Sequence, residues 1–258
     1  MNKPAILLAF FLTLTTNLLF GQSYESTRFY LGGHLAGSMP WIINQNNYGL
    51  PELKYKPSLG FSGGMVAGVS FTSQHQLQLE VSYALLGQTY EDKIFGGSIP
   101  FRKDIDLSYI QLPIMYRFGM KRAQDAMFYT DVTTFFFTAG VQPSFLLAEG
   151  IDWTVDGEKQ NWAQIRNEFS DPSYGYSTIL QSPLTGGNFY TNFDFGVAGG
   201  FGVQRFFNER LLISLELRTY LGLLDINETQ WRVLNRSGKY GASQNFSAGL
   251  RLNASYIF

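Results

Sequence analysis

Hydrophobic and polar residues alternate with a period of two along most of the chain after residue 22. In the segment 58–71, one set of alternate positions is apolar at six of seven places, and the other set is small or polar at six of seven. A helix would mix the two sets, whereas a strand separates them onto opposite faces. This segment is therefore predicted to be a β-strand with one apolar face.

The same alternation recurs in seven further segments, so the chain has eight predicted strands. They cover approximately residues 28–38, 58–71, 77–85, 105–118, 135–145, 193–203, 213–221 and 246–258. Their polar faces carry mostly glycine, serine, alanine, asparagine and glutamine, whereas the polar faces of a soluble sandwich meet water and usually carry charges. Small side chains fit a narrow lumen, and large apolar ones fit lipid. We therefore expect an all-β fold, an eight-stranded antiparallel up-and-down transmembrane β-barrel, in preference to a soluble sandwich.

The connections between these strands differ in length in a regular way. The first, third, fifth and seventh connections are long, at about 39–57, 91–103, 148–190 and 222–242. The second, fourth and sixth cover about 72–76, 119–133 and 206–211, and the fifth strand can begin inside 119–133. Short periplasmic turns and long extracellular loops are typical of outer-membrane barrels. The pattern predicts that both chain ends lie on the periplasmic side.

The first 21 residues have the composition of a secretory signal peptide. Lys3 precedes an almost uncharged apolar run at 5–20, and Gly21 offers a small residue at the cleavage point. The alternative is an N-terminal membrane helix, for which a run of 16 residues is short. We therefore expect a signal peptide at 1–21 and an exported barrel domain at 22–258, located in the outer membrane of a Gram-negative cell.

Composition narrows the function classes. The formal net charge is −1, so a basic surface for nucleic acid is not expected. Charged residues make up 15% and aromatic residues 16%, with a mean hydropathy of −0.06, which does not fit a helical membrane protein. The absence of cysteine excludes disulfides, thiol nucleophiles, cysteine–zinc sites and a lipoprotein anchor.

Several segments resemble the PorT-like outer-membrane β-barrel family that is common in Bacteroidetes. They are YIQLPIMYRF at 109–118, FDFGVAGGFGV at 193–203 and LELRTYLGL at 215–223. The chain also ends in an aromatic residue, Phe258, after a period-two strand, and this resembles the signal that the barrel-assembly machinery reads. The resemblance extends over most of 22–258 and implies the fold and the location. It implies little about activity, because the family is functionally mixed.

The inward set of positions carries six charged residues. They are Glu80, Arg117, Asp194, Glu216, Arg218 and Arg251. A buried charge is costly unless it is paired, so we expect a lumen charge network. This network would be either an ion-selective constriction or a salt-bridged plug. Eight strands leave room for little more than side chains, which favours the plug.

Catalysis and metal binding have few candidate residues. His75 lies in a predicted periplasmic turn, and His34 points inward, where it could contact Glu80. A contact of that kind inside a lumen is usually structural, and two isolated histidines do not make a zinc site. We therefore predict no catalytic site, no cofactor and no metal, with a surface enzyme acting through His34 as the alternative.

The third outer connection is a candidate contact surface. Its aromatic residues are Trp153, Trp162, Tyr174 and Tyr176, and Asp156-Gly157 is a turn dipeptide that predicts an extended hairpin. The loop could instead fold onto itself as a lid with packed aromatics. The expected role is structural or binding through the outer loops, with a small porin-like channel or a component of an envelope or secretion complex as alternatives. The expected partners are outer-membrane lipid, lipopolysaccharide, the barrel-assembly machinery during biogenesis and an envelope protein.

Overall fold

A computed structural model describes most of the barrel region of the chain. The described residues are 27–48, 50, 52–72, 74–94, 98–120, 133–169, 187–207, 210–234 and 238–258. The predicted signal peptide at 1–21 lies outside these residues and stays a prediction. None of the helices in the described ranges is long and apolar enough to cross a membrane.

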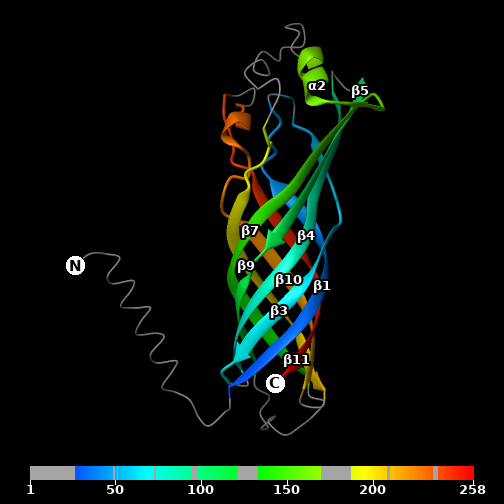
Figure 1. The fold of residues 1–258 in the computed structure, drawn as a ribbon. Helices are drawn as coiled ribbons and strands as arrows, with labels where there is room; N and C mark the ends of the chain where they lie inside the picture. Colours follow the sequence, from blue (N-terminus) through cyan, green and yellow to red (C-terminus); the bar gives the residue numbers. More distant parts are fainter. Residues whose placement is uncertain are drawn as a thin grey trace, which may run out of the picture.

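The described chain forms one antiparallel sheet that closes on itself as a barrel (Figure 1). Its strands are β1 (Arg28–Ile43), β2 (Lys54–Lys56), β3 (Gly60–Ser70), β4 (His75–Ile94), β5 (Ile99–Gln111), β6 (Ile114–Gly119), β7 (Thr133–Val155), β8 (Glu158–Gln160), β9 (Phe193–Phe207), β10 (Leu211–Gly222) and β11 (Gln244–Ile257). Around the ring, the order is β4-β3-β1-β11-β10-β9-β7, and β5 and β6 close it by pairing with both β7 and β4.

The ring has eight strand positions, so the predicted fold class is confirmed for the described residues. Strands β5 and β6 together occupy one of these positions, because both lie between β4 and β7. Their separation falls at Pro113, which has no N–H to donate, although its carbonyl accepts from the backbone N–H of Glu80 at 3.0 Å. Strands β2 and β8 are short additions that pair only with β4 and β7, respectively.

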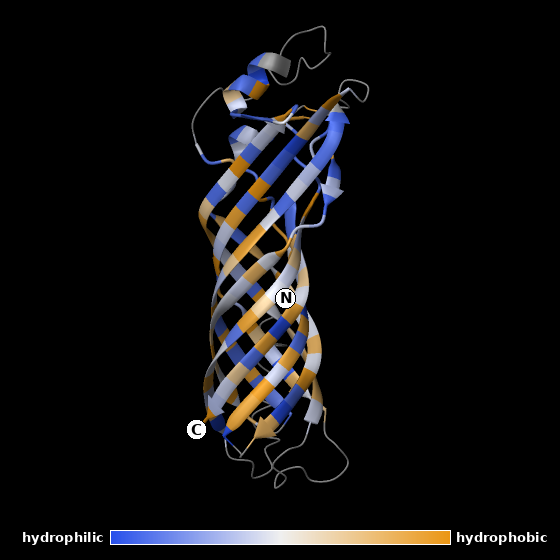
Figure 2. Ribbon diagram, turned by 90° about the vertical axis from the view of Figure 1, so that its right-hand side faces the viewer, coloured by the Kyte–Doolittle hydropathy of each residue, from blue (hydrophilic) through white to orange (hydrophobic). Residues whose placement is uncertain are grey.

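Side chains face the two sides as the alternation predicted. Leu35, Phe61 and Leu250 are 71%, 60% and 56% exposed on the outer wall, whereas His34 of β1 and Asn253 of β11 are buried inside. Figure 2 shows hydrophobic and hydrophilic positions alternating along the strands. Glycine makes room in the narrow interior at Gly68, where an added Cβ would lie 2.1 Å from the ring of Tyr30. The lumen is therefore crowded by its own side chains.

Both ends of the described chain lie at one end of the barrel, which we call the inner end. The backbone N–H of Phe258 donates to the carbonyl of Phe29 at 2.9 Å, and β1 pairs with β11 along its whole length up to Ile43. The strand ends that flank the second, fourth and sixth connections lie at this end, and the strand ends that flank the other connections lie at the outer end (Figure 1). This arrangement agrees with the predicted alternation of short and long loops.

The strands near the outer end are longer than predicted. Residues 91–103, which we expected to be a loop, are largely strand, because β4 continues to Ile94 and β5 starts at Ile99. Strand β7 likewise continues to Val155, where Asp156 (φ 49°) and Gly157 (φ 85°) turn it into β8, as the Asp-Gly dipeptide predicted. Near the outer end, the strands remain paired although their outward side chains are polar. The end of the apolar pattern therefore comes before the end of the strand.

Candidate functional site: a filled lumen and a closed outer end

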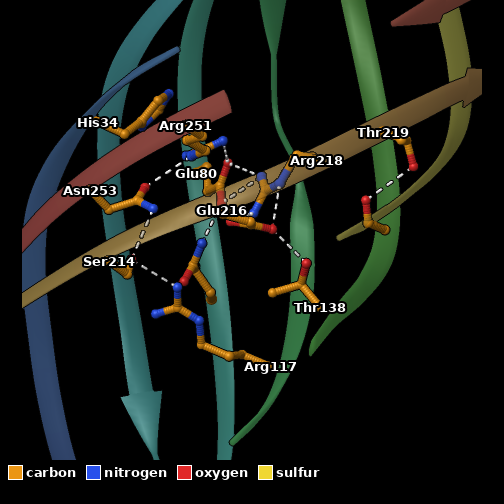
Figure 3. A network of polar contacts seen from close by, with 12 residues as sticks. His34, Glu80, Arg117, Thr138, Ser214, Glu216, Arg218, Thr219, Arg251 and Asn253 are labelled. Atoms are coloured by element: carbon orange, nitrogen blue, oxygen red, sulfur yellow. Dashed lines mark hydrogen bonds and ion pairs between the residues drawn. The ribbon is translucent and has the colours of Figure 1, made fainter. Parts of the chain in front are cut away.

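Four of the six predicted lumen charges meet midway along the barrel. Arg218 of β10 contacts Glu80 of β4 at 2.8 Å and Glu216 of its own strand at 2.9 Å. Arg251 of β11 contacts the same Glu80 at 2.6 Å. We call Glu80, Glu216, Arg218 and Arg251 the charge cluster. Figure 3 shows these side chains, which come from β4, β10 and β11, pointing toward one another.

The charge cluster is buried and extensively hydrogen-bonded. The side chains of Glu80 and Glu216 are 0% exposed, and Arg218 grips Glu216 through Nε and Nη2 in a two-point contact. Thr138 donates to Glu216 at 2.6 Å, and Gln78 donates to Glu80. Charges removed from water are tolerated only when they are paired and hydrogen-bonded. Each of the four charges has an ion-pair partner, and Arg251 Nη2 is the one buried side-chain donor of the cluster that has no hydrogen-bond partner among the described residues.

The other two predicted members do not join the charge cluster. Arg117 of β6 donates to Ser214 Oγ at 3.0 Å, and its guanidinium lies 3.7 Å from the ring centroid of Phe136. Asp194 of β9 lies nearer the outer end and accepts hydrogen bonds from Tyr220 at 3.0 Å and from Asn245 at 2.9 Å. Neither residue forms an ion pair within the described part of the chain. The predicted network of six therefore divides into one cluster of four and two separate groups.

The two histidines lie far apart. His34 is buried in the lumen wall, and its Nε2 lies 3.0 Å from Ser82 Oγ, so its partner is Ser82 and not the expected Glu80. His75 starts β4 at the inner end and contacts the hydroxyl of Tyr116. In the described ranges, no group of three or more acidic or histidine residues is placed to hold a metal ion.

Apolar layers lie on both sides of the charge cluster. Toward the inner end, Tyr30, Val66, Leu212 and Ile257 pack together inside the barrel. Toward the outer end, Met115, Ala198 and Tyr220 form a second buried group. The interior therefore alternates between apolar and polar layers along the axis, and each layer consists of side chains from several strands.

A large hydrophobic core closes the outer end, and we call it the aromatic cap. Its buried members are Ile42, Tyr48, Leu50, Leu53, Tyr90, Phe101, Ile105, Leu107, Tyr109, Trp153, Val155, Trp162, Ile165, Tyr190, Ile226 and Trp231. Tyr48 lies at its centre, with ring centroids of Trp162, Trp231 and Trp153 at 5.3, 5.8 and 5.9 Å. Because these residues come from all four outer connections or the strands beside them, the loops share one core.

The predicted contact residues of the third outer connection have a different role from the one expected. Trp153 is 2% exposed and Trp162, at the start of α2 (Trp162–Phe169), is 7% exposed. They pack into the aromatic cap, which corrects the expectation that they lie at the surface. The alternative of a folded lid describes them better. Tyr174 and Tyr176 lie outside the described residues.

A lysine inside the aromatic cap was not anticipated from the sequence. Lys103 of β5 is 1% exposed, and its Nζ donates to the carbonyl of Asn46 at 2.9 Å. Nζ also lies 4.5 Å from the ring centroid of Tyr48 and 5.0 Å from that of Trp153. Burial lowers the pKa of Lys103 to about 7. This amine connects the first outer connection to β5 and β7.

The outer surface around the aromatic cap carries paired charges of both signs. Arg102 of β5 contacts Glu91 at 2.8 Å and Asp104 at 2.6 Å, and Lys159 of β8 contacts Asp152 at 2.9 Å. These side chains point outward from the same strands whose lower parts are apolar. The change from apolar to charged marks where the wall leaves the lipid.

Sequence comparison identifies the family of the barrel. A family model described as the outer membrane protein beta-barrel domain matches residues 20–228, which is well over half of the chain. The chain belongs to this outer membrane β-barrel family. The membership and the lipid-facing wall place the barrel in the Gram-negative outer membrane. No curated protein matches the chain.

Several solved outer-membrane barrels are similar to this family member in fold. OprG from Pseudomonas aeruginosa is 8% identical with a TM-score of 0.47, over 92% of this chain and 98% of that one. Outer Membrane Protein W from E. coli is 12% identical with a TM-score of 0.37, over 92% and 100%. Neisserial surface protein A is 10% identical with a TM-score of 0.38, over 89% and 98%.

Breaking the charge cluster is expected to destabilise the barrel. Glu80→Gln leaves Arg218 and Arg251 with one carboxylate between them, and an uncompensated buried charge costs about 3–5 kcal/mol. Urea unfolding of the protein in lipid vesicles measures this loss. The matched change Glu91→Gln, in an exposed ion pair, should cost less than about 1 kcal/mol. Equal losses for the two variants would contradict a structural role for the cluster.

The buried amine predicts a pH dependence of stability. Between pH 7 and about 10.5, the unfolded chain holds the Lys103 proton and the folded chain does not, so the free energy of unfolding rises with pH. We expect the wild type to gain roughly a few kcal/mol over Lys103→Met across this range, by urea unfolding followed through tryptophan fluorescence. Lys159→Met, at the surface, should track the wild type. Parallel curves for the wild type and Lys103→Met would refute the effect.

Proposed function

We propose that this protein is a closed outer-membrane barrel of structural or binding type, which acts through the part that stands outside the lipid. The proposal rests on the observation that several layers of side chains, one above another along the axis, fill the barrel. The inner layer around Tyr30, the charge cluster and the aromatic cap each fill the cross-section. A barrel filled in this way has no lumen to offer to a solute, so its outer end is the surface left for function.

The outer end has the features of a stable platform. The long hairpins of β4, β5 and β7 extend beyond the lipid-facing band, and the aromatic cap joins them to the other outer connections. Glu149 accepts the backbone N–H groups of Phe189 and Tyr190 at 2.7 and 2.9 Å, which ties the returning third connection to β7. A surface that is already rigid loses less conformational entropy when it binds a partner.

Enzymatic activity receives little support from the one buried histidine. His34 lies in the lumen wall beside Ser82, and the nearest charges that act on it, Arg251 and Glu80, are already paired with each other. It is 4% exposed, so a lipid or peptide substrate would have no path to it. We therefore favour a non-enzymatic role. The narrower PorT-like assignment and a component role in an envelope or secretion complex stay alternatives within this proposal.

A porin-like channel is tested directly by conductance. We expect the purified protein in planar lipid bilayers to show no steady single-channel steps, because three filled layers block the axis. A porin inserted under the same conditions verifies that the recording detects open barrels. Reproducible steps of one size, present in the wild type at neutral pH, would overturn the closed-barrel function in favour of the channel.

The end at which the protein acts is tested by site-specific cross-linking in living cells. A photoreactive amino acid is placed at Lys159, exposed at the outer end, or at Arg28, exposed at the inner end. We expect light-dependent adducts with lipopolysaccharide or an envelope protein from position 159, because that end carries the rigid surface. Adducts obtained only from position 28 would instead favour a periplasm-facing component of a secretion complex.

A further inference from the structure

The charges inside the membrane-spanning part of the barrel do not balance locally. Between the Tyr30 layer and the Tyr220 layer, the described inward residues include three guanidinium groups and two carboxylates. They are Arg117, Arg218 and Arg251 against Glu80 and Glu216. The charge cluster uses both carboxylates on Arg218 and Arg251. Arg117 is therefore the cation in excess, and a protonated His34 would only increase that excess.

The third lumen carboxylate is too distant to compensate Arg117. The register aligns Arg117 with Thr138 on β7, and Thr138 with Gly200 on β9. Asp194 lies six residues further along β9, which corresponds to roughly 20 Å at about 3.3 Å per residue. Its hydrogen-bond partners are Tyr220 and Asn245. The two opposite charges therefore belong to different levels of the barrel.

The hydrogen-bond donors around Arg117 are not all satisfied. Arg117 is 2% exposed, and its Nε has no partner. Ser214 Oγ accepts from Arg117 Nη2 at 3.0 Å and from Asn253 Nδ2 at 3.1 Å, which leaves the hydroxyl proton of Ser214 for a third group (Figure 3). Gln76 and Gln204, opposite Arg117 and Ser214 in register, also have buried side-chain oxygens without a partner among the described residues, but an amide oxygen carries no formal charge. An acceptor with negative charge satisfies the two donors and also balances the guanidinium.

We propose that the lumen binds one small monovalent inorganic anion beside Arg117 and Ser214, with chloride as the ion available in the medium. The anion neutralises the third guanidinium and accepts from Arg117 Nε and the Ser214 hydroxyl. The Tyr30 layer closes the site on the inner side and the charge cluster closes it on the outer side. Such an ion enters when the barrel folds and stabilises the closed state.

The first test measures stability against chloride at constant ionic strength. The purified protein is refolded into vesicles in mixtures of sodium chloride and sodium gluconate, and urea unfolding is followed by tryptophan fluorescence. Above the dissociation constant, the unfolding equilibrium constant should fall about tenfold for a tenfold rise in chloride. Arg117→Gln should abolish this dependence, and Arg28→Gln, the same change at an exposed position of β1, should retain it.

A second variant and a direct measurement keep the outcome decisive if Arg117→Gln does not fold. Ser214→Asp supplies a carboxylate next to Arg117, so it should fold without chloride and lose the chloride dependence. Crystals grown with sodium bromide should show an anomalous peak beside Arg117. The proposal is overturned if the wild type is equally stable in gluconate and chloride and the bromide peak is absent, which would mean that water alone solvates Arg117.

Discussion

A lumen that is only as wide as its own side chains is the constraint on which this structure depends. Lipid surrounds the outer wall, so polar side chains in the membrane-spanning part of the eight-stranded barrel can point only inward. There they meet each other instead of bulk water, and each charge must find a partner within a few residues of its own level. The charge cluster is the result, with Glu80 shared between Arg218 and Arg251 and with Thr138 and Gln78 as further donors.

The same constraint connects the interior to the outer end. A barrel this narrow cannot gain function by enclosing a ligand, and its strands instead continue beyond the lipid as paired hairpins. Once there, their inward faces turn from polar to aromatic, and Tyr48 and Trp231 from the outer connections complete a core with Trp153. Surface charges such as Arg102 and Glu91 now face water on the outer side. The outer part is therefore a small globular unit built on a membrane barrel.

The sequence could predict which side chains face the lumen and which face the lipid. It could not predict which of the inward side chains contact one another. Alternation placed Glu80, Glu216, Arg218 and Arg251 inside the lumen, where the structure also brings them together. Arg117 and Asp194 share that facing, but Arg117 contacts Ser214 and Asp194 contacts Tyr220 and Asn245 in place of the cluster. A period of two gives the face of a residue and not its contacts across the lumen. The aromatic cap was foreseen only in part, as the alternative of a folded lid with packed aromatics in the third outer connection. Its members from the outer connections, such as Tyr48 and Trp162, lie where the alternation stops, so the pattern could not decide whether they are buried or exposed.

Three of the cations inside the barrel, Arg218, Lys103 and Arg117, show how positive charge is accommodated away from water. Arg218 lies between two carboxylates, which is the fully compensated arrangement. Lys103 has only a carbonyl and aromatic faces, and it can lose its proton because a lysine, unlike an arginine, becomes neutral at accessible pH. Arg117 has one hydroxyl and the face of Phe136, and it cannot lose its proton. Of the three, Arg117 is therefore the one that keeps its charge without an ion pair of its own in the described part of the chain, and it is the charge that the proposed anion balances.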